Sequence, residues 1–123
     1  MSQNRVYLGS DGFIHNEYEG DQDYGSVKLV EGESVRLAEG LRAAGRPVLI
    51  LADLRRMGKS DPSSRRAARE ALDMHVYDRC AIAGGNVFLR HLANFIIMAS
   101  RRAKDVRFLD TPEEAAAWLR KSP

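Results

Sequence analysis

Three adjacent residues, Gly58, Lys59 and Ser60, are of the types that bind phosphate in nucleotide-hydrolysing proteins. They follow the apolar segment VLILADL and precede a helical pattern. A phosphate-binding loop also needs a glycine five residues before Gly58, because its backbone must wrap tightly with its amides pointing at the phosphates. That position is Asp53, whose carboxylate would repel phosphate. The sequence therefore does not predict a nucleotide hydrolase.

The same segment predicts a helix start that could bind another anion. Asp61 is of the type that caps a helix, and Pro62 suits the first helical position. The free amides and the dipole of a first helical turn favour an anion. The candidate binding residues here are Lys59, Ser60, Ser63 and Ser64. The alternative is that these residues only cap the helix and face solvent.

A second candidate turn is formed by Gly84, Gly85 and Asn86, which lie between a short apolar segment and an apolar helical pattern. In open α/β sheets, ligands usually bind at the carboxyl ends of the strands. We expect both turns at this edge, so that two helix N-termini converge on one small anion. The alternative is that the glycines only allow a tight turn between strand and helix.

Catalytic chemistry has few candidates in this chain. Cys80, the single cysteine, could meet His75 or His91 in space, and Asp53 with Asp61 could serve acid–base or metal chemistry. No Cys/His cluster has the spacing of a zinc site, and one cysteine excludes an internal disulfide. We expect no catalysis, metal or cofactor, and keep an enzyme using Asp53 or Cys80 as an alternative.

The elements that would position these residues follow from periodicity and from turn and cap residues, with Asp61, Asn86 and Thr111 as the expected helix caps. The front of the chain predicts a hairpin around Asp11-Gly12 and then a loop over 19–26. The rest alternates helix and strand, which predicts parallel strands joined by crossovers. We expect one α/β domain over 1–123, with a mixed sheet of about five strands and about four helices. The expected strands are Arg5–Leu8, Phe13–Tyr18, 47–54, 80–85 and 105–110, and the expected helices are Gly32–Ala44, one from Pro62, 87–102 and 111–121.

The helix expected over 87–102 is apolar around more than half of its circumference. We expect one stripe to cover the sheet: Phe88, Leu92, Phe95, Ile96 and Ala99. The excess apolar residues Leu89, Ile97 and Met98 then predict an interface with a second copy or with a partner. The alternative is a helix packed between the sheet and a neighbouring helix or the hairpin.

Composition excludes several partner classes. The chain has 123 residues, 44% hydrophobic and 29% charged, with a net charge of +2, which creates no field to gather nucleic acid. The longest apolar run, 95–99, is too short to span a bilayer, and no apolar run follows the N-terminus. We expect a soluble cytoplasmic protein without nucleic-acid partners.

The segment LILADLRRMGKSDPSS resembles the strand, loop and helix of STAS domains of the SpoIIAA-like, anti-anti-sigma-factor-like branch. Asp53-Leu54 matches the end of the strand, and Asp61-Pro62-Ser63-Ser64 matches the start of the helix. AIAGG, VRFLD and EEAAAWL are similar to the later strands and the terminal helix, so the resemblance covers about Pro47 to Leu119. It implies a sheet flanked by helices, no cofactor, and function through protein–protein binding.

One position departs from the family pattern. In phosphoswitched members the phosphorylated serine directly follows the aspartate, whereas here Pro62 has no hydroxyl and Ser63 is the nearest substitute. The relationship of this fold to CRAL-TRIO lipid-binding domains implies a small apolar ligand as well. We therefore expect a non-catalytic regulatory module that binds a protein partner, or alternatively a carrier or sensor of a small anionic or lipid-like molecule.

Overall fold

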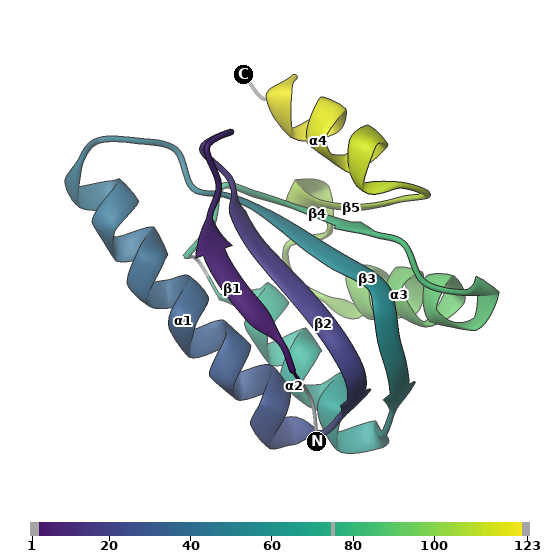
Figure 1. Cartoon of the computed structure of the whole chain (residues 1–123). Coiled ribbons are helices and arrows are strands. Elements are labelled where there is room, and N and C mark those ends of the chain that lie inside the picture. The colour runs from purple at the N-terminus through teal and green to yellow at the C-terminus, as the bar shows by residue number, and fades with distance from the viewer. Residues whose placement is uncertain (1–2, 75, 122–123) are drawn as a thin grey trace.

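The sheet of the computed structural model has five strands in the order β1-β2-β3-β4-β5 (Figure 1). The structure describes residues 3–74 and 76–121. β1 pairs antiparallel with β2, and β2 to β5 are parallel. The strands span Arg5–Leu8, Ile14–Gln22, Leu49–Ser60, Arg79–Ala83 and Val106–Leu109.

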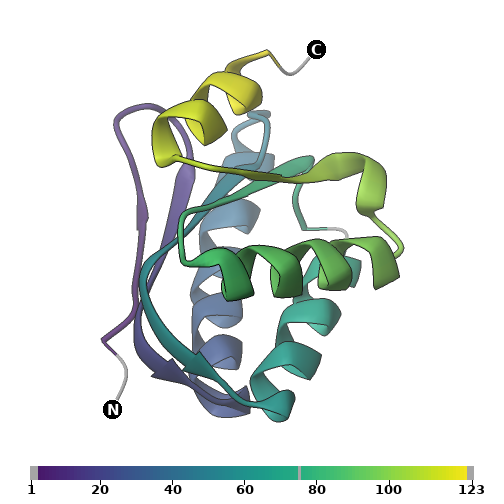
Figure 2. The same ribbon diagram turned by 90° about the vertical axis from the view of Figure 1, so that its right-hand side faces the viewer.

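Four helices form two layers on the sheet. The helices α1, α2 and α3 each connect neighbouring parallel strands, and right-handed crossovers place all three on one face. Helix α4 follows the last strand and covers the opposite face (Figure 2). The helices span Tyr24–Ala43, Pro62–Asp73, Val87–Ala99 and Pro112–Arg120, and a short 3₁₀ helix, η1, spans Ala103–Asp105. The predicted mixed α/β sheet flanked by helices is confirmed.

Alternation along the strands divides the apolar side chains between two cores. Ile50 and Cys80 face α1, α2 and α3, while Leu51 and Ala81 face α4. This alternation explains why the central strands read as continuous apolar runs, since both of their faces are covered.

The first two parallel strands are longer than expected. β2 continues to Gln22 and β3 to Ser60, and they pair through Glu19 with Arg56 and Gln22 with Ser60. The loop expected over 19–26 is wrong, because 19–22 is strand and α1 already begins at Tyr24. Asp23 caps α1 in a reciprocal pair with Ser26, a weaker sequence signal than the usual glutamate.

The other helix starts follow their predicted caps. Asp61, Asn86 and Thr111 each accept a hydrogen bond from the third helical amide that follows. Within the described part of the chain, no helix combines the length and the apolar character that crossing a membrane requires.

Candidate functional site: an apolar cavity beneath α3

The start of α2 is occupied by the protein's own carboxylate. The Ser64 amide donates to Asp61 Oδ1 over 2.8 Å, and the Ser63 hydroxyl donates to the same oxygen over 2.7 Å. Ser63 Oγ also accepts from the Tyr24 amide at 3.1 Å. The Ser63 hydroxyl and then the Ser64 amide hold the pKa of Asp61 below its usual range. The amide and hydroxyl that an anion would need are therefore engaged by Asp61.

The backbone amide of Lys59 is already engaged by a carboxylate of the chain itself. Its N–H donates to Asp21 Oδ1 over 2.8 Å, and its neighbour Gly58 packs closely against the same strand-end segment. The triplet of Gly58, Lys59 and Ser60 lies inside β3 and not in a loop. This placement agrees with its exclusion as a nucleotide-binding loop.

The glycine turn before α3 has a steric explanation. Gly84 and Gly85 both have φ of +87°, a conformation that favours glycine. A Cβ on Gly84 would lie 2.5 Å from Arg55 Cγ, so the turn packs directly against β3. Asn86 caps α3 by accepting from the Leu89 amide over 2.9 Å.

The expected convergence of the two turns on one anion is wrong. The last paired residues of β3 and β4 are Asp53 and Ala83, and β3 then continues to Ser60 beside β2, beyond the end of β4. This extension carries the start of α2 about 20 Å further along the strand direction than Gly84. Figure 2 shows the start of α2 well below the start of α3. Both turns follow carboxyl ends of strands, but they form two separate groups.

A cavity of about 140 Å³, partly open to solvent, lies between the sheet and the three helices α1, α2 and α3. Its lining includes small residues from the sheet and two helices: Ala52, Ala68, Ala71 and Ala93. Leu54, Ile82, Leu89 and Ile96 complete much of the apolar wall. An enclosed apolar cavity of about 150 Å³ in another protein binds benzene, and this partly open space offers a comparable volume for a compound with a small apolar body.

Two predicted site residues reach this cavity. Ser60 and Ser64 both line it, with their hydroxyl oxygens 2.6 Å apart. Ser64 is buried, because the long β3 brings the first turn of α2 back over the sheet. Lys59, Ser63, Gly84, Gly85 and Asn86 are not among the lining residues.

Several polar groups also line the cavity, and sequence reasoning missed most of them, including Tyr18 and Glu31. Burial, with smaller contributions from Cys80 and Glu31, raises the pKa of the Tyr18 phenol. Burial likewise raises the pKa of the Cys80 thiol to about 12. At neutral pH, Cys80 is therefore a protonated lining group without the thiolate that a nucleophile requires.

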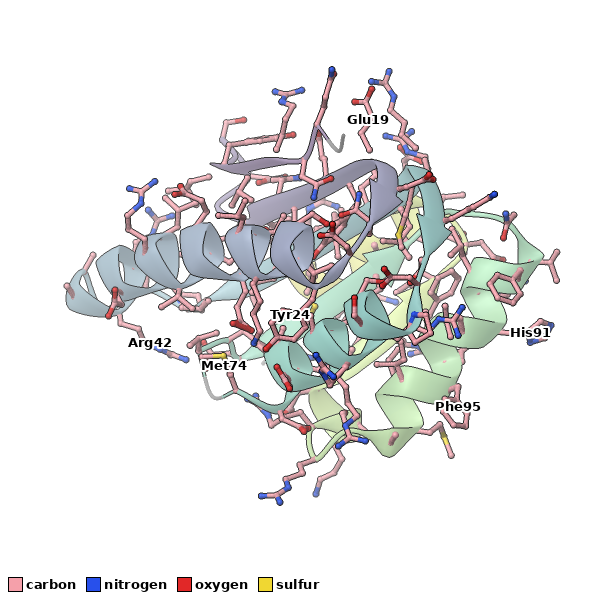
Figure 3. The ribbon with its side chains drawn as sticks, turned by 90° about the horizontal axis from the view of Figure 1, so that it is seen from below. Glu19, Tyr24, Arg42, Met74, His91 and Phe95 are labelled. Carbon is pink, nitrogen blue, oxygen red and sulfur yellow. The ribbon has the colours of Figure 1, made fainter. Side chains whose placement is uncertain are left out.

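The other catalytic candidates do not share this site. Asp53 lies in a polar depression with Arg55 and Arg5, and Arg55 hydrogen-bonds its carboxylate over 2.8 to 3.1 Å. Burial opposes ionisation of Asp53, but the hydrogen bonds from Arg55 outweigh it and lower the pKa of Asp53. His91 is exposed, and Figure 3 shows it pointing away from the molecule. His75 lies outside the described residues.

The inner face of α3 overlaps only in part with the expected one, because Ile96 faces inward as expected whereas Phe95 does not. Leu89 and Ile97 are only 4% and 7% exposed, so they pack inside the chain and cannot form the predicted interface. Phe95 and Met98 are 72% and 80% exposed, and Phe95 points into solvent in Figure 3. Both faces fit the helical period, so the sequence pattern could not identify the inner one. Of the three predicted interface residues, Met98 remains available.

The comparisons with known proteins agree on the fold. No family model matches the sequence, and no curated protein shows significant similarity to it. An uncharacterised DUF3478-family protein with a SpoIIAA-like fold, from Shewanella loihica PV-4, aligns with a TM-score of 0.62 and 14% identity, covering 96% of this chain and 93% of its own. The anti-sigma factor antagonist SpoIIAA in its unphosphorylated form aligns with a TM-score of 0.64 and 14% identity, covering 98% and 100%.

These alignments cover nearly all of both chains, so this chain has a SpoIIAA-like, STAS-type α/β fold. The fold that the LILADLRRMGKSDPSS segment predicted is confirmed. At 14% identity, the likeness concerns the fold alone.

Proposed function

We propose that this chain is a non-catalytic, cofactor-free cytoplasmic regulatory module that binds a small, largely apolar ligand beneath α3 and reports its presence to a protein partner. The observation that carries the proposal is the cavity of about 140 Å³ against the sheet, where tight packing would have opposed a ligand. This reading joins the two functions that the sequence left open, the partner-binding module and the small-molecule carrier or sensor.

Helix α3 supports the link between ligand and partner, because it has apolar side chains on both faces. Leu89, Ala93 and Ile96 line the cavity, while Phe95 and Met98 are exposed on the other side. A ligand that shifts the position of α3 against the sheet would move the exposed side chains as well. The partner is a protein, by analogy with SpoIIAA, an anti-sigma factor antagonist of the same fold.

The ligand part of the proposal is tested by native mass spectrometry of the purified protein. We expect a mass excess from a co-purified small compound, and the same spectrum reports whether the chain is a homodimer. Ala93→Leu fills the cavity and should abolish the excess, whereas Ala99→Leu at an exposed position of the same helix should retain it. A mass spectrum that shows no ligand, and that stays unchanged after small apolar compounds are added, would contradict the proposal.

The partner part is tested by affinity capture from cell lysate with wild-type protein and two variants. Phe95→Glu removes exposed apolar surface and should lose a specific partner, while Arg36→Glu on the distant α1 should keep it. If both variants capture the same proteins as the wild type, the exposed face of α3 is not the partner surface.

A further inference from the structure

The exposed side of α3 carries most of the large apolar side chains that this chain leaves in solvent. Of the six such side chains in residues 3–74 and 76–121, four belong to α3 and are 61% to 80% exposed. These four form the α3 patch: Val87, Phe88, Phe95 and Met98. Single exposed apolar residues are normal on a protein surface, whereas several gathered on one element indicate an interaction site.

Basic side chains border the α3 patch. On α2, the guanidinium carbon of Arg65 lies 6.0 Å from the centre of the Phe88 ring, and Arg69 is exposed one helical turn further on. Beyond the end of α3, the Arg101 amide donates to Asp73 Oδ1 over 2.7 Å, so the ends of α2 and α3 meet there. The 3₁₀ helix η1 contacts α3 as well. The basic border of the patch therefore consists of Arg65, Arg69, Arg101 and Lys104.

The basic border is not neutralised within the described chain. Its four side chains form no ion pair with a carboxylate of residues 3–74 and 76–121. Glu70, Asp105 and Asp110 are each paired with other basic residues, and α3 itself contains no acidic residue. The whole chain carries only +2, so this surface concentrates positive charge locally and favours an acidic partner.

The two rings of the patch form a narrow stripe. Phe88 and Phe95 are about two helical turns apart, so both lie on the side of α3 that Arg65 approaches. His91, between them in the sequence, is exposed and points away from the molecule in Figure 3. The stripe is therefore bordered by basic side chains of α2 on one side and by polar side chains of α3 on the other.

We infer that the protein partner places an acidic amphipathic helix on the α3 patch, with apolar side chains against Phe88 and Phe95 and Asp and Glu side chains against the basic border. Apolar residues at positions i, i+3 or i+4 and i+7 of such a helix span the same two turns. This inference rests on the proposed function, because it needs the exposed face of α3 to be the partner surface.

Two other occupants fit these observations less well. A second copy docked by the same face would bring two basic borders together, and juxtaposed like charges oppose association. An anionic bilayer matches the charge, but the stripe is narrow, and inserting it would also take the neighbouring His91 and Asn94 out of water.

The experiment selects random peptides displayed on phage, about 16 residues long and so able to form four helical turns, for binding to the full chain. Parallel selections use Phe95→Glu and Met98→Glu, which should stay folded because both side chains are exposed. We expect peptides that bind the wild type and neither variant, and that combine Asp or Glu with apolar residues at helical spacing.

Synthetic copies of the selected peptides are then titrated by fluorescence anisotropy. Arg69→Glu should weaken their binding about fivefold, because it replaces an attractive charge by a repulsive one at an exposed position. Arg36→Glu, the same change on α1, should leave binding unchanged. Added salt should weaken binding to the wild type more than binding to Arg69→Glu.

The outcomes separate this inference from the proposed function. If peptides that depend on Phe95 are not acidic, or if Arg69→Glu binds them as tightly as the wild type, the acidic helix is overturned while the partner surface stands. If no peptide depends on Phe95 or Met98, the partner surface of the proposed function fails and the inference falls with it. Sedimentation with phosphatidylglycerol vesicles that Phe95→Glu abolishes, without acidic peptides in the selection, would identify a membrane-binding surface and overturn the inference.

Discussion

At the scale of single residues, Asn86 shows how a predicted site residue acts through local structure. Its side chain accepts from the Leu89 amide at the start of α3. Asn86→Ala removes this cap and should lower the free energy of unfolding by about 1 kcal/mol. Asn94→Ala, at an exposed position within the same helix, should have almost no effect. Urea denaturation followed by circular dichroism measures both, and equal effects would contradict the capping role.

Asp78 makes stability depend on pH in a defined direction. It accepts from the Val48 amide at 2.8 Å and from Arg42 at 3.1 Å. Burial opposes ionisation, but these contacts outweigh it and lower the pKa of Asp78 in the folded protein. The stabilisation is therefore complete above the unfolded carboxyl pKa of about 4 and is lost as the pH falls through the folded pKa.

The variant Asp78→Asn tests this direction. The stability difference between wild type and variant should be constant from pH 7 to about pH 5 and should shrink as the pH falls towards about 3. Urea midpoints across this range measure it. A difference that grows on acidification would show that the sign is wrong.

The predictions for single residues were correct where the sequence signal lies next to the residue itself. Asp61, Asn86 and Thr111 were identified as caps because each stands directly before a helical pattern. Glu31 and Tyr18 could not be assigned to the cavity, since their position depends on how α1 and the end of β2 pack together.

At the scale of elements, α3 has an inner and an outer face that the sequence pattern could not separate. Ile97→Ala should lower the free energy of unfolding by about 2 to 4 kcal/mol, because Ile97 belongs to the core beneath the helix. Phe95→Ala should change it by less than about 1 kcal/mol, since its ring is exposed. Denaturant titration compares them. A larger loss for Phe95→Ala would restore the face expected from the sequence.

The extension of β3 was missed for a related reason. Its residues Arg55, Arg56 and Lys59 are charged, and such residues rarely form strand interiors. The extension exists because β2 continues beside it and because Asp21 accepts from the Lys59 amide. Neither contact can be predicted from the segment itself, so the sequence did not predict that the two turns lie apart.

At the scale of the whole molecule, the chain order of the elements and the parallel part of the sheet followed from the alternation of helix and strand. The cavity did not, because it arises where small residues of separate elements face one another. Ala52, Ala68 and Ala93 are ordinary residues in their own segments, and only the packing of α2 and α3 over the sheet brings them around one space.

The central claim is that this space takes a small apolar compound, and its most direct test is a toluene titration of the wild type, Ala93→Leu and Ala99→Leu by amide NMR. We predict saturable shifts at cavity residues for the wild type and Ala99→Leu, and none for Ala93→Leu, which should remain folded. Absence of saturable shifts in the wild type, or equal binding by Ala93→Leu, would contradict the account.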